Sequence, residues 1–166
     1  LLIAASDNGM IWDESRFLRL KEECDCLVWT FRNNQTVMEK PEGYGWVIVD
    51  SDDETVKNMS VKVPISDNPI KDHAVVGAFW FREGNIFVEA TEKMIRENIR
   101  INNEFYVDEA INQVIQLGYK VKVMEIDKYI CWGTPNDLKI FEYWQEFFNE
   151  MNFHEYSKEK DNYYGR

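Results

Sequence analysis

The stretch that decides the fold runs from Arg100 to Leu138 and reads RINNEFYVDEAINQVIQLGYKVKVMEIDKYICWGTPNDL. It passes from acidic residues beside a short apolar turn into a helical pattern over Val107–Leu117, then into a strand pattern over Tyr119–Ile126, and it closes on Gly133-Thr134-Pro135. Acids and a tight glycine turn then fall at strand ends, where open α/β sheets bind ligands. The stretch therefore predicts an α/β fold with a ligand site at one sheet edge.

Outward from this stretch, the other apolar segments alternate between strand and helix patterns. The continuous apolar run Leu1–Ala5 is typical of a strand buried on both faces. Because several strands follow one another directly, we expect a mixed rather than a purely parallel sheet. We expect residues 1–152 to form the α/β domain and 153–166 a polar tail. The other predicted strands are 26–31, 46–49, 56–63 and 74–81, and the other predicted helices are 13–23, 86–97 and 135–151.

Composition and charge limit the classes of partner. The 166 residues are 45% hydrophobic and 14% aromatic, enough for one sizeable core. A net charge of -11 argues against nucleic acid or an anionic membrane as the main partner, although a bound divalent cation can still admit a nucleotide. No apolar run reaches the roughly 18 residues of a membrane helix. The chain shows no signal-peptide pattern and has an odd number of cysteines, three, which favour a cytoplasmic location.

Six short segments, in this order, resemble the nucleotidyltransferase family that activates sugar phosphates and related phosphorylated precursors with an NTP. The resemblance covers most of the chain up to about Trp144 and is closest to members from bacterial capsule and surface-polysaccharide gene sets. It implies a Rossmann-like, mixed but mostly parallel sheet with flanking helices, Mg²⁺ as cofactor, pyrophosphate as a product, and a possible homo-oligomer. The segments are IAASDNG (3–9), YGWV (44–47), VKVP (61–64), VGAFWF (76–81), NEFYVD (103–108) and WGTP (132–135).

The family's signature Gly-rich loop, which wraps the triphosphate, has no counterpart in this chain. The loop would precede the strand that carries the metal aspartate, and the chain begins with that strand. We therefore expect the C-terminal part of a longer enzyme, inactive by itself, with the contacts to the NTP base in the missing part. A natural short form is the alternative. The identities of the NTP and of the phosphorylated precursor stay open.

Asp7 and Lys62 are the predicted catalytic residues. A carboxylate at a strand end can hold Mg²⁺, and the resemblance makes Asp7 the metal aspartate. An ordinary Asp-Asn-Gly turn is the alternative. The resemblance makes Lys62 a point charge on the attacking phosphate, although Val61 stands where the family often has Glu. A solvated strand lysine is the alternative for Lys62.

Four further residues are predicted to bind substrate. Gly45 and Gly77 lack a Cβ, so they can let a sugar or phosphate approach the backbone, or can simply serve turn and bulge geometry. By resemblance, Glu104 binds substrate hydroxyls. Asp108 belongs to the same acidic segment, but it can equally charge the N-terminus of its helix.

One expected acid is replaced. Many family members carry an acid two residues before the closing Gly-Thr, where this chain has Cys131, a poor Mg²⁺ ligand. Either Asp127, Asp108 or substrate oxygens would then complete the metal sphere, or Asp7 and phosphates alone would hold the metal. Trp12 and Trp46 flank the predicted site, where they can stack on a base or sugar or belong to the core.

Two rival functions stay open. An NDP-sugar glycosyltransferase would normally show a D-x-D metal motif, and Asp7-Asn8-Gly9 lacks the second acid. A non-catalytic nucleotide-sugar-binding or regulatory module is the other rival, since the Gly-rich loop is missing.

Overall fold

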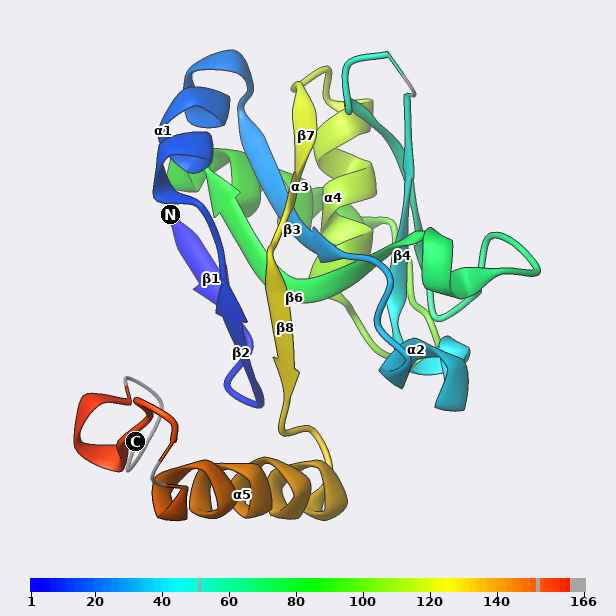
Figure 1. The fold of residues 1–166 in the computed structure, drawn as a ribbon. Coiled ribbons are helices and arrows are strands. Elements are labelled where there is room, and N and C mark those ends of the chain that lie inside the picture. The colour runs from blue at the N-terminus through cyan, green and yellow to red at the C-terminus, as the bar shows by residue number, and fades with distance from the viewer. Residues whose placement is uncertain (51, 152, 162–166) are drawn as a thin grey trace.

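A mixed six-stranded sheet forms the centre of the molecule in this computed structural model, which describes residues 1–50, 52–151 and 153–161 (Figure 1). The strand order is β5 (Val56–Val61), β4 (Gly45–Val49), β6 (His73–Phe81), β3 (Cys26–Phe31) and β7 (Val121–Glu125), and β1 (Leu2–Ala4) also pairs with β6. One edge of β6 pairs with β3. The other edge pairs with β4 near the start of β6 and with β1 near its end.

The mixed sheet confirms the predicted α/β class, but its pairing is not mostly parallel. Among the described strands only β3 and β7 pair in parallel, and the other pairs in the sheet are antiparallel. The prediction for Leu1–Ala5 is wrong in its burial. Because β1 pairs only with β6 in the described part of the chain, Leu1 is 48% exposed and Leu2 60% exposed.

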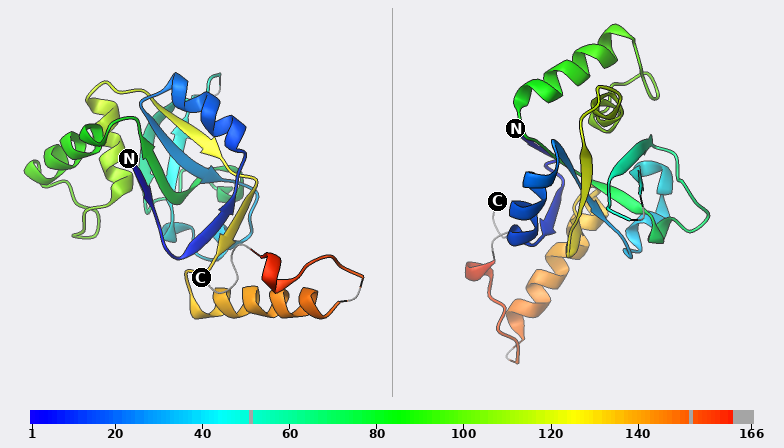
Figure 2. Two further views of the ribbon diagram at one scale, coloured as in Figure 1. Left: turned by 90° about the vertical axis from the view of Figure 1, so that its left-hand side faces the viewer. Right: turned by 90° about the horizontal axis from the view of Figure 1, so that it is seen from above.

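Helices cover both faces of the sheet (Figure 2). The side chains of β3 alternate between the faces: Cys26 and Val28 join the core beneath α3 and α4, whereas Leu27 and Trp29 join the core that includes Leu20 of α1. Both faces of β3 are therefore covered, as its continuous apolar sequence CLVWTF predicts. The helices are α1 (Glu14–Glu23), α2 (Thr36–Glu39), α3 (Gly84–Arg96) and α4 (Val107–Gln116), with short 3₁₀ turns at Pro41–Gly43 and Pro69–Lys71.

A two-stranded sheet and a final helix lie below the central sheet in Figure 1. β2 (Asn8–Ile11) pairs with β8 (Lys128–Cys131) in antiparallel fashion, a pairing that the sequence does not predict. β8 leads through the Gly133 turn into α5 (Pro135–Glu150). A capping box between Thr134 and Asp137 starts this helix, and Pro135 occupies its first turn. None of the described helices is long and apolar enough to cross a membrane.

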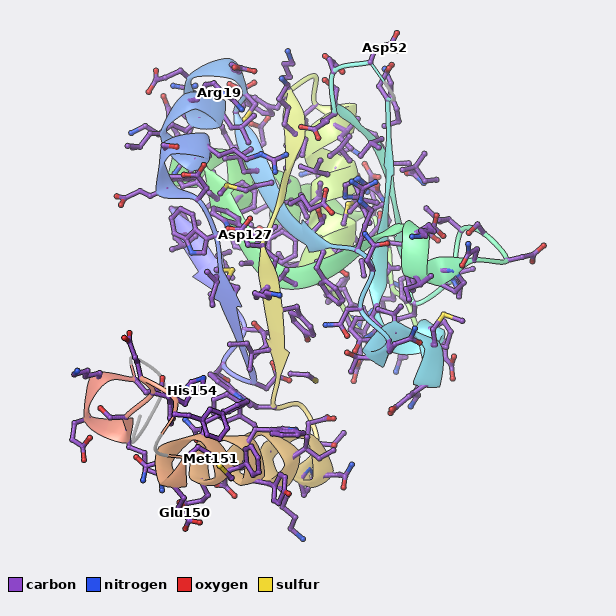
Figure 3. The ribbon with its side chains drawn as sticks, viewed as in Figure 1. Arg19, Asp52, Asp127, Glu150, Met151 and His154 are labelled. Atoms are coloured by element: carbon purple, nitrogen blue, oxygen red, sulfur yellow. The ribbon has the colours of Figure 1, made fainter. Side chains whose placement is uncertain are left out.

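The predicted polar tail, 153–166, lies partly outside the described residues, at 162–166. Its described part folds back toward α5: Tyr156 and Gln145 both donate hydrogen bonds to Asp161, at 2.7 and 2.9 Å, and a 3₁₀ turn spans Lys158–Lys160. The imidazole of His154 stacks on Phe148 with ring centroids 4.6 Å apart (Figure 3). These contacts hold the described part of the tail against the last turns of α5.

Candidate functional site

A cavity of about 600 Å³ opens where β2, β4, β6 and β8 approach the start of α4 and of α5. Five of the six predicted site residues line it: Asp7, Gly45, Lys62, Gly77 and Asp108. These residues come from separate segments, so the sequence alone does not place them together. The observed cavity agrees with a site at one edge of an α/β sheet.

Asp7 lies at the turn between β1 and β2, and two hydrogen bonds fix this turn, one from a side chain and one from the backbone. The Asn8 side chain donates to the Val76 carbonyl at 2.9 Å, and the Trp132 amide donates to the Asp7 carbonyl at 2.9 Å. The Asp7 side chain is exposed. The turn thus presents an accessible carboxylate from a fixed backbone.

Gly77 lies in β6 between the residues that pair with β4 and the residues that pair with β1. Its φ is +93°, a left-handed conformation that glycine tolerates best. Its carbonyl accepts a hydrogen bond from the Ala5 amide at 2.9 Å, and a Cβ on Gly77 would lie 3.0 Å from the Ala5 Cβ. Gly77 is therefore needed for the close packing of the Asp7 turn on β6. In the described structure, this backbone conformation and close packing explain why a glycine occupies position 77.

Gly45 is needed for a different reason. A Cβ placed on it would lie 1.9 Å from Asp108 Oδ2, so the carboxyl group of Asp108 occupies the space of the missing side chain. Asp108 itself stands in the first turn of α4. Burial raises the pKa of this carboxyl to about 6, while the nearby Lys62 ammonium acts in the opposite direction. Asp108 is thus a cavity acid whose pKa lies above that of an ordinary aspartate.

Lys62 follows β5 with a φ of +62°, an uncommon conformation for a residue with a side chain. Its ammonium donates a hydrogen bond to the Gly43 carbonyl and lies 5.5 Å from the centre of the Tyr106 ring. The Tyr106 hydroxyl in turn donates to Glu104 at 2.5 Å. Glu104 does not line the cavity in the described structure, although Tyr106 does. The predicted role of Glu104 in binding substrate stays a prediction.

The closing turn contributes Asp137, which was not among the residues predicted for the site. Asp137 lines the cavity and accepts hydrogen bonds from the amide and hydroxyl of Thr134, at 3.0 and 2.7 Å, and from the Cys131 thiol at 3.5 Å. Burial, reinforced by Asp137, raises the pKa of the Cys131 thiol, which disfavours the thiolate needed for a nucleophile. The pattern Thr-x-x-Asp before an apolar run was the signal that could have identified Asp137.

The donor set suits a magnesium ion that is held mainly by its substrate. Among the described residues, no group of three or more His, Cys, Asp or Glu side chains could hold a metal ion. Asp7 offers one exposed carboxylate, and Mg²⁺ commonly binds through one or two carboxylates with waters and substrate phosphates completing its sphere. Asp127 lies between β7 and β8 (Figure 3) and is not among the described residues that line the cavity.

The two tryptophans do not take the stacking role considered above. Trp46 is fully buried in the core and donates from its indole to the Pro41 carbonyl at 3.0 Å. Trp12 packs edge-on against Phe17 and Trp29. Neither lines the cavity in the described structure. Both tryptophans therefore contribute to core packing rather than to the cavity.

The fold matches solved sugar-phosphate nucleotidyltransferases. A nucleoside-diphosphate-sugar pyrophosphorylase from Vibrio cholerae RC9 aligns over 84% of this chain and 54% of its own, with 17% identity and a TM-score of 0.66. A UTP-bound UGPase from Acinetobacter baumannii aligns over 92% and 53%, with 14% identity and a TM-score of 0.63. The inositol-1-phosphate CTP transferase from T. maritima aligns over 90% and 56%, with 13% identity and a TM-score of 0.56.

The chain spans about half the length of each of these structures. No protein-family model and no curated protein matches its sequence. At identities of this size the likeness establishes the fold, which confirms the nucleotidyltransferase-like fold inferred from the six sequence segments.

Proposed function

We propose that this chain is part of a nucleotidyltransferase that joins an NTP to a phosphorylated sugar or related precursor and releases pyrophosphate. The observation that carries the proposal is the cavity, which gathers Asp7, Lys62 and Asp108 with two glycines from separate segments of a nucleotidyltransferase-like fold. Surface-polysaccharide synthesis is the proposed setting, from the sequence resemblance. A cytoplasmic location and self-association also stay predictions.

The chemistry proposed for the cavity relies on positioning rather than on a protein nucleophile. An oxygen of the precursor's phosphate attacks the α-phosphorus of the NTP in line, and pyrophosphate leaves. Lys62 orients the attacking phosphate through its ammonium, which keeps hydrogens beyond the one given to Gly43. Asp7 would hold Mg²⁺, which when bound neutralises charge on the phosphates. In this proposal Asp108 forms a hydrogen bond with a hydroxyl of the precursor.

The glycosyltransferase alternative gains no support from the Asp7 turn. A second acid in a D-x-D motif would stand at Gly9, which is buried in β2. The intervening Asn8 anchors the turn on β6 and does not supply a carboxylate. Nucleotidyl transfer therefore agrees better with a turn that offers a single carboxylate.

The test is a titration of the chain with Mn²⁺ and each of the four NTPs, followed by paramagnetic broadening of amide NMR signals. We expect the Asn8 and Trp132 amides, whose residues flank and bond the Asp7 turn, to broaden first. Asp7→Asn should weaken this binding at least about tenfold, because a charged ligand is lost. Asp127→Asn, an exposed turn acid outside the cavity, is the matched control. Equal binding by Asp7→Asn and the unmodified chain would refute the metal role.

A further inference from the structure

More acidic than basic side chains line the cavity, so an anionic substrate can bind only beside the few cationic side chains of the lining. Its lining acids are Asp7, Glu39, Asp108 and Asp137, and its lining cations are Lys40 and Lys62. A phosphomonoester carries close to two negative charges at neutral pH. Asp7, the proposed metal ligand, can recruit one metal ion, which leaves the precursor's phosphate to be neutralised by side chains.

Both lysines of the cavity lining have side chains that reach Gly43. Lys62 donates from its ammonium to the Gly43 carbonyl. The aliphatic stem of Lys40 lies beside Gly43, since a Cβ there would be 3.8 Å from Lys40 Cγ and 3.9 Å from Cδ. The two lysines thus line the cavity beside the same residue, although they are far apart in sequence.

The backbone holds both lysines to the same 3₁₀ turn. The Gly43 amide donates to the Lys40 carbonyl at 2.8 Å, and the Lys62 amide donates to the Tyr44 carbonyl at 3.1 Å. The left-handed conformation of Lys62 is maintained within this arrangement. An uncommon backbone conformation kept by its surroundings is a frequent feature of binding sites.

The Lys40 ammonium is available for a ligand. Within the described residues it forms no hydrogen bond or ion pair, whereas Lys62 is held by Gly43 and Tyr106. Glu39 is the neighbouring cavity acid and is exposed, as Lys40 is. Exposed pairs of this kind contribute little, so Glu39 does not remove Lys40 from competition for a phosphate.

We propose that Lys40 is a second phosphate-binding residue, which together with Lys62 binds the dianionic phosphomonoester of the precursor at the Gly43 turn. This inference rests on the proposed function, since it concerns the same cavity and the same class of substrate. The shared chemistry, a phosphate group, could also come from the NTP. We assign it to the precursor because Lys62, its proposed partner, is the residue that orients the attacking phosphate.

The test is an NMR titration of the chain with methyl phosphate at pH 7.5, read from the amide signals of Gly43 and Gly45. Lys40→Gln and Lys62→Gln should each raise the Kd about 5- to 20-fold, the effect of losing one charge-assisted hydrogen bond. Lys40→Arg should retain most of the affinity. Lys139→Gln, which removes an exposed lysine of α5, is the matched control and should leave the Kd unchanged.

Two further ligands separate the possible outcomes. Dimethyl phosphate, a monoanion, should bind more weakly than methyl phosphate and lose less affinity in Lys40→Gln. Inorganic triphosphate tests the NTP as the source: a larger loss for triphosphate than for methyl phosphate would contradict the assignment to the precursor. Unchanged methyl phosphate affinity in Lys40→Gln, or no binding by the unmodified chain, would refute the inference.

The result is distinguishable from failure of the proposed function. Lys40-dependent binding of methyl phosphate without any Asp7-dependent binding of Mn²⁺ would keep the phosphate site and reject the metal role proposed for Asp7. The reverse pattern would keep nucleotidyl transfer and reject Lys40.

Discussion

Asp7 and Asp108 line the same cavity, yet the protein holds them in opposite ways. Asp7 is exposed on a turn that is held by the Asn8 side chain on β6 and by the Trp132 amide on the Asp7 carbonyl. Asp108 stands at the start of a helix with its carboxyl group in the space above Gly45, where burial raises its pKa to about 6. An exposed carboxylate can exchange water for a cation, whereas a buried one is suited to hydrogen bonding. The comparison shows that the position of a cavity acid can depend on a glycine, since the carboxyl group of Asp108 fits only because Gly45 has no side chain.

The largest effect expected from this comparison is that of Gly45→Ala. The new Cβ would lie 1.9 Å from Asp108 Oδ2 and 3.3 Å from Val75 Cγ2, so the Asp108 side chain must move. We expect a loss of about 2–3 kcal/mol in the free energy of unfolding, as for other overpacked sites. Urea unfolding followed by circular dichroism measures it.

Two variants check that the steric clash is the cause. Gly84→Ala adds a methyl group where nothing lies within 4 Å, and it should change stability by less than about 0.5 kcal/mol. Gly45→Ala combined with Asp108→Ala should cost less than the sum of the two single changes, because the clashing carboxyl is gone. Strict additivity would show that Asp108 is not the obstacle.

The second expectation concerns pH. The pKa of Asp108 is about 6 in the folded chain against an ordinary value of 3.8, so the folded state binds more protons than the unfolded state between these values. Stability contributed by protonated Asp108 is then lost as the pH rises from about 4 to about 6, by about 2 kcal/mol, and stays lost above that range.

The measurement is the difference in unfolding free energy between the unmodified chain and Asp108→Asn across this pH range. Subtracting the two unfolding free energies removes the contribution of the other carboxyl groups. Glu125 is an example: Arg32 lowers its pKa, so its contribution to stability changes with pH in the opposite direction. A difference that does not vary between pH 4 and 6 would contradict burial as the cause.

The sequence predicted the parts of this site that depend on local pattern. The continuous apolar runs of β3 and β6 and the amphipathic stripe of α4 were sufficient to predict those elements, and the ordered segments were sufficient to predict the fold. The pairing of β2 with β8 and the fit of Asp108 over Gly45 were not predictable, because they join residues far apart in the chain. Local patterns do not encode which distant groups meet. The exposure of Leu2 was missed for the same reason, since burial depends on which strands pair.

The third expectation compares two glycines with nearly the same backbone. Gly77 has φ +93° and Gly118 has φ +89°, so an alanine is strained at both, by about 1 kcal/mol. Only Gly77 also has a neighbour in the way, the Ala5 Cβ at 3.0 Å, while Gly118 faces open space. Thermal or urea unfolding should therefore show a cost of about 2 kcal/mol for Gly77→Ala and about 1 kcal/mol for Gly118→Ala. Equal costs would mean that β1 moves freely away from β6.

The smallest expected effect tests whether the Asp7 turn needs its anchor. Asn8→Ala removes the 2.9 Å hydrogen bond from Nδ2 to the Val76 carbonyl, and it should lower the free energy of unfolding by about 1 kcal/mol. Because the amide of Trp132 still holds the Asp7 carbonyl, the turn should loosen rather than unfold. The informative readout is therefore the binding of Mn²⁺ and NTP, which should weaken more in Asn8→Ala than in Thr36→Ala, a cavity-lining change away from this turn. If both variants bind alike, the backbone of β2 and β8 alone positions Asp7, and the side chain of Asn8 contributes only to stability.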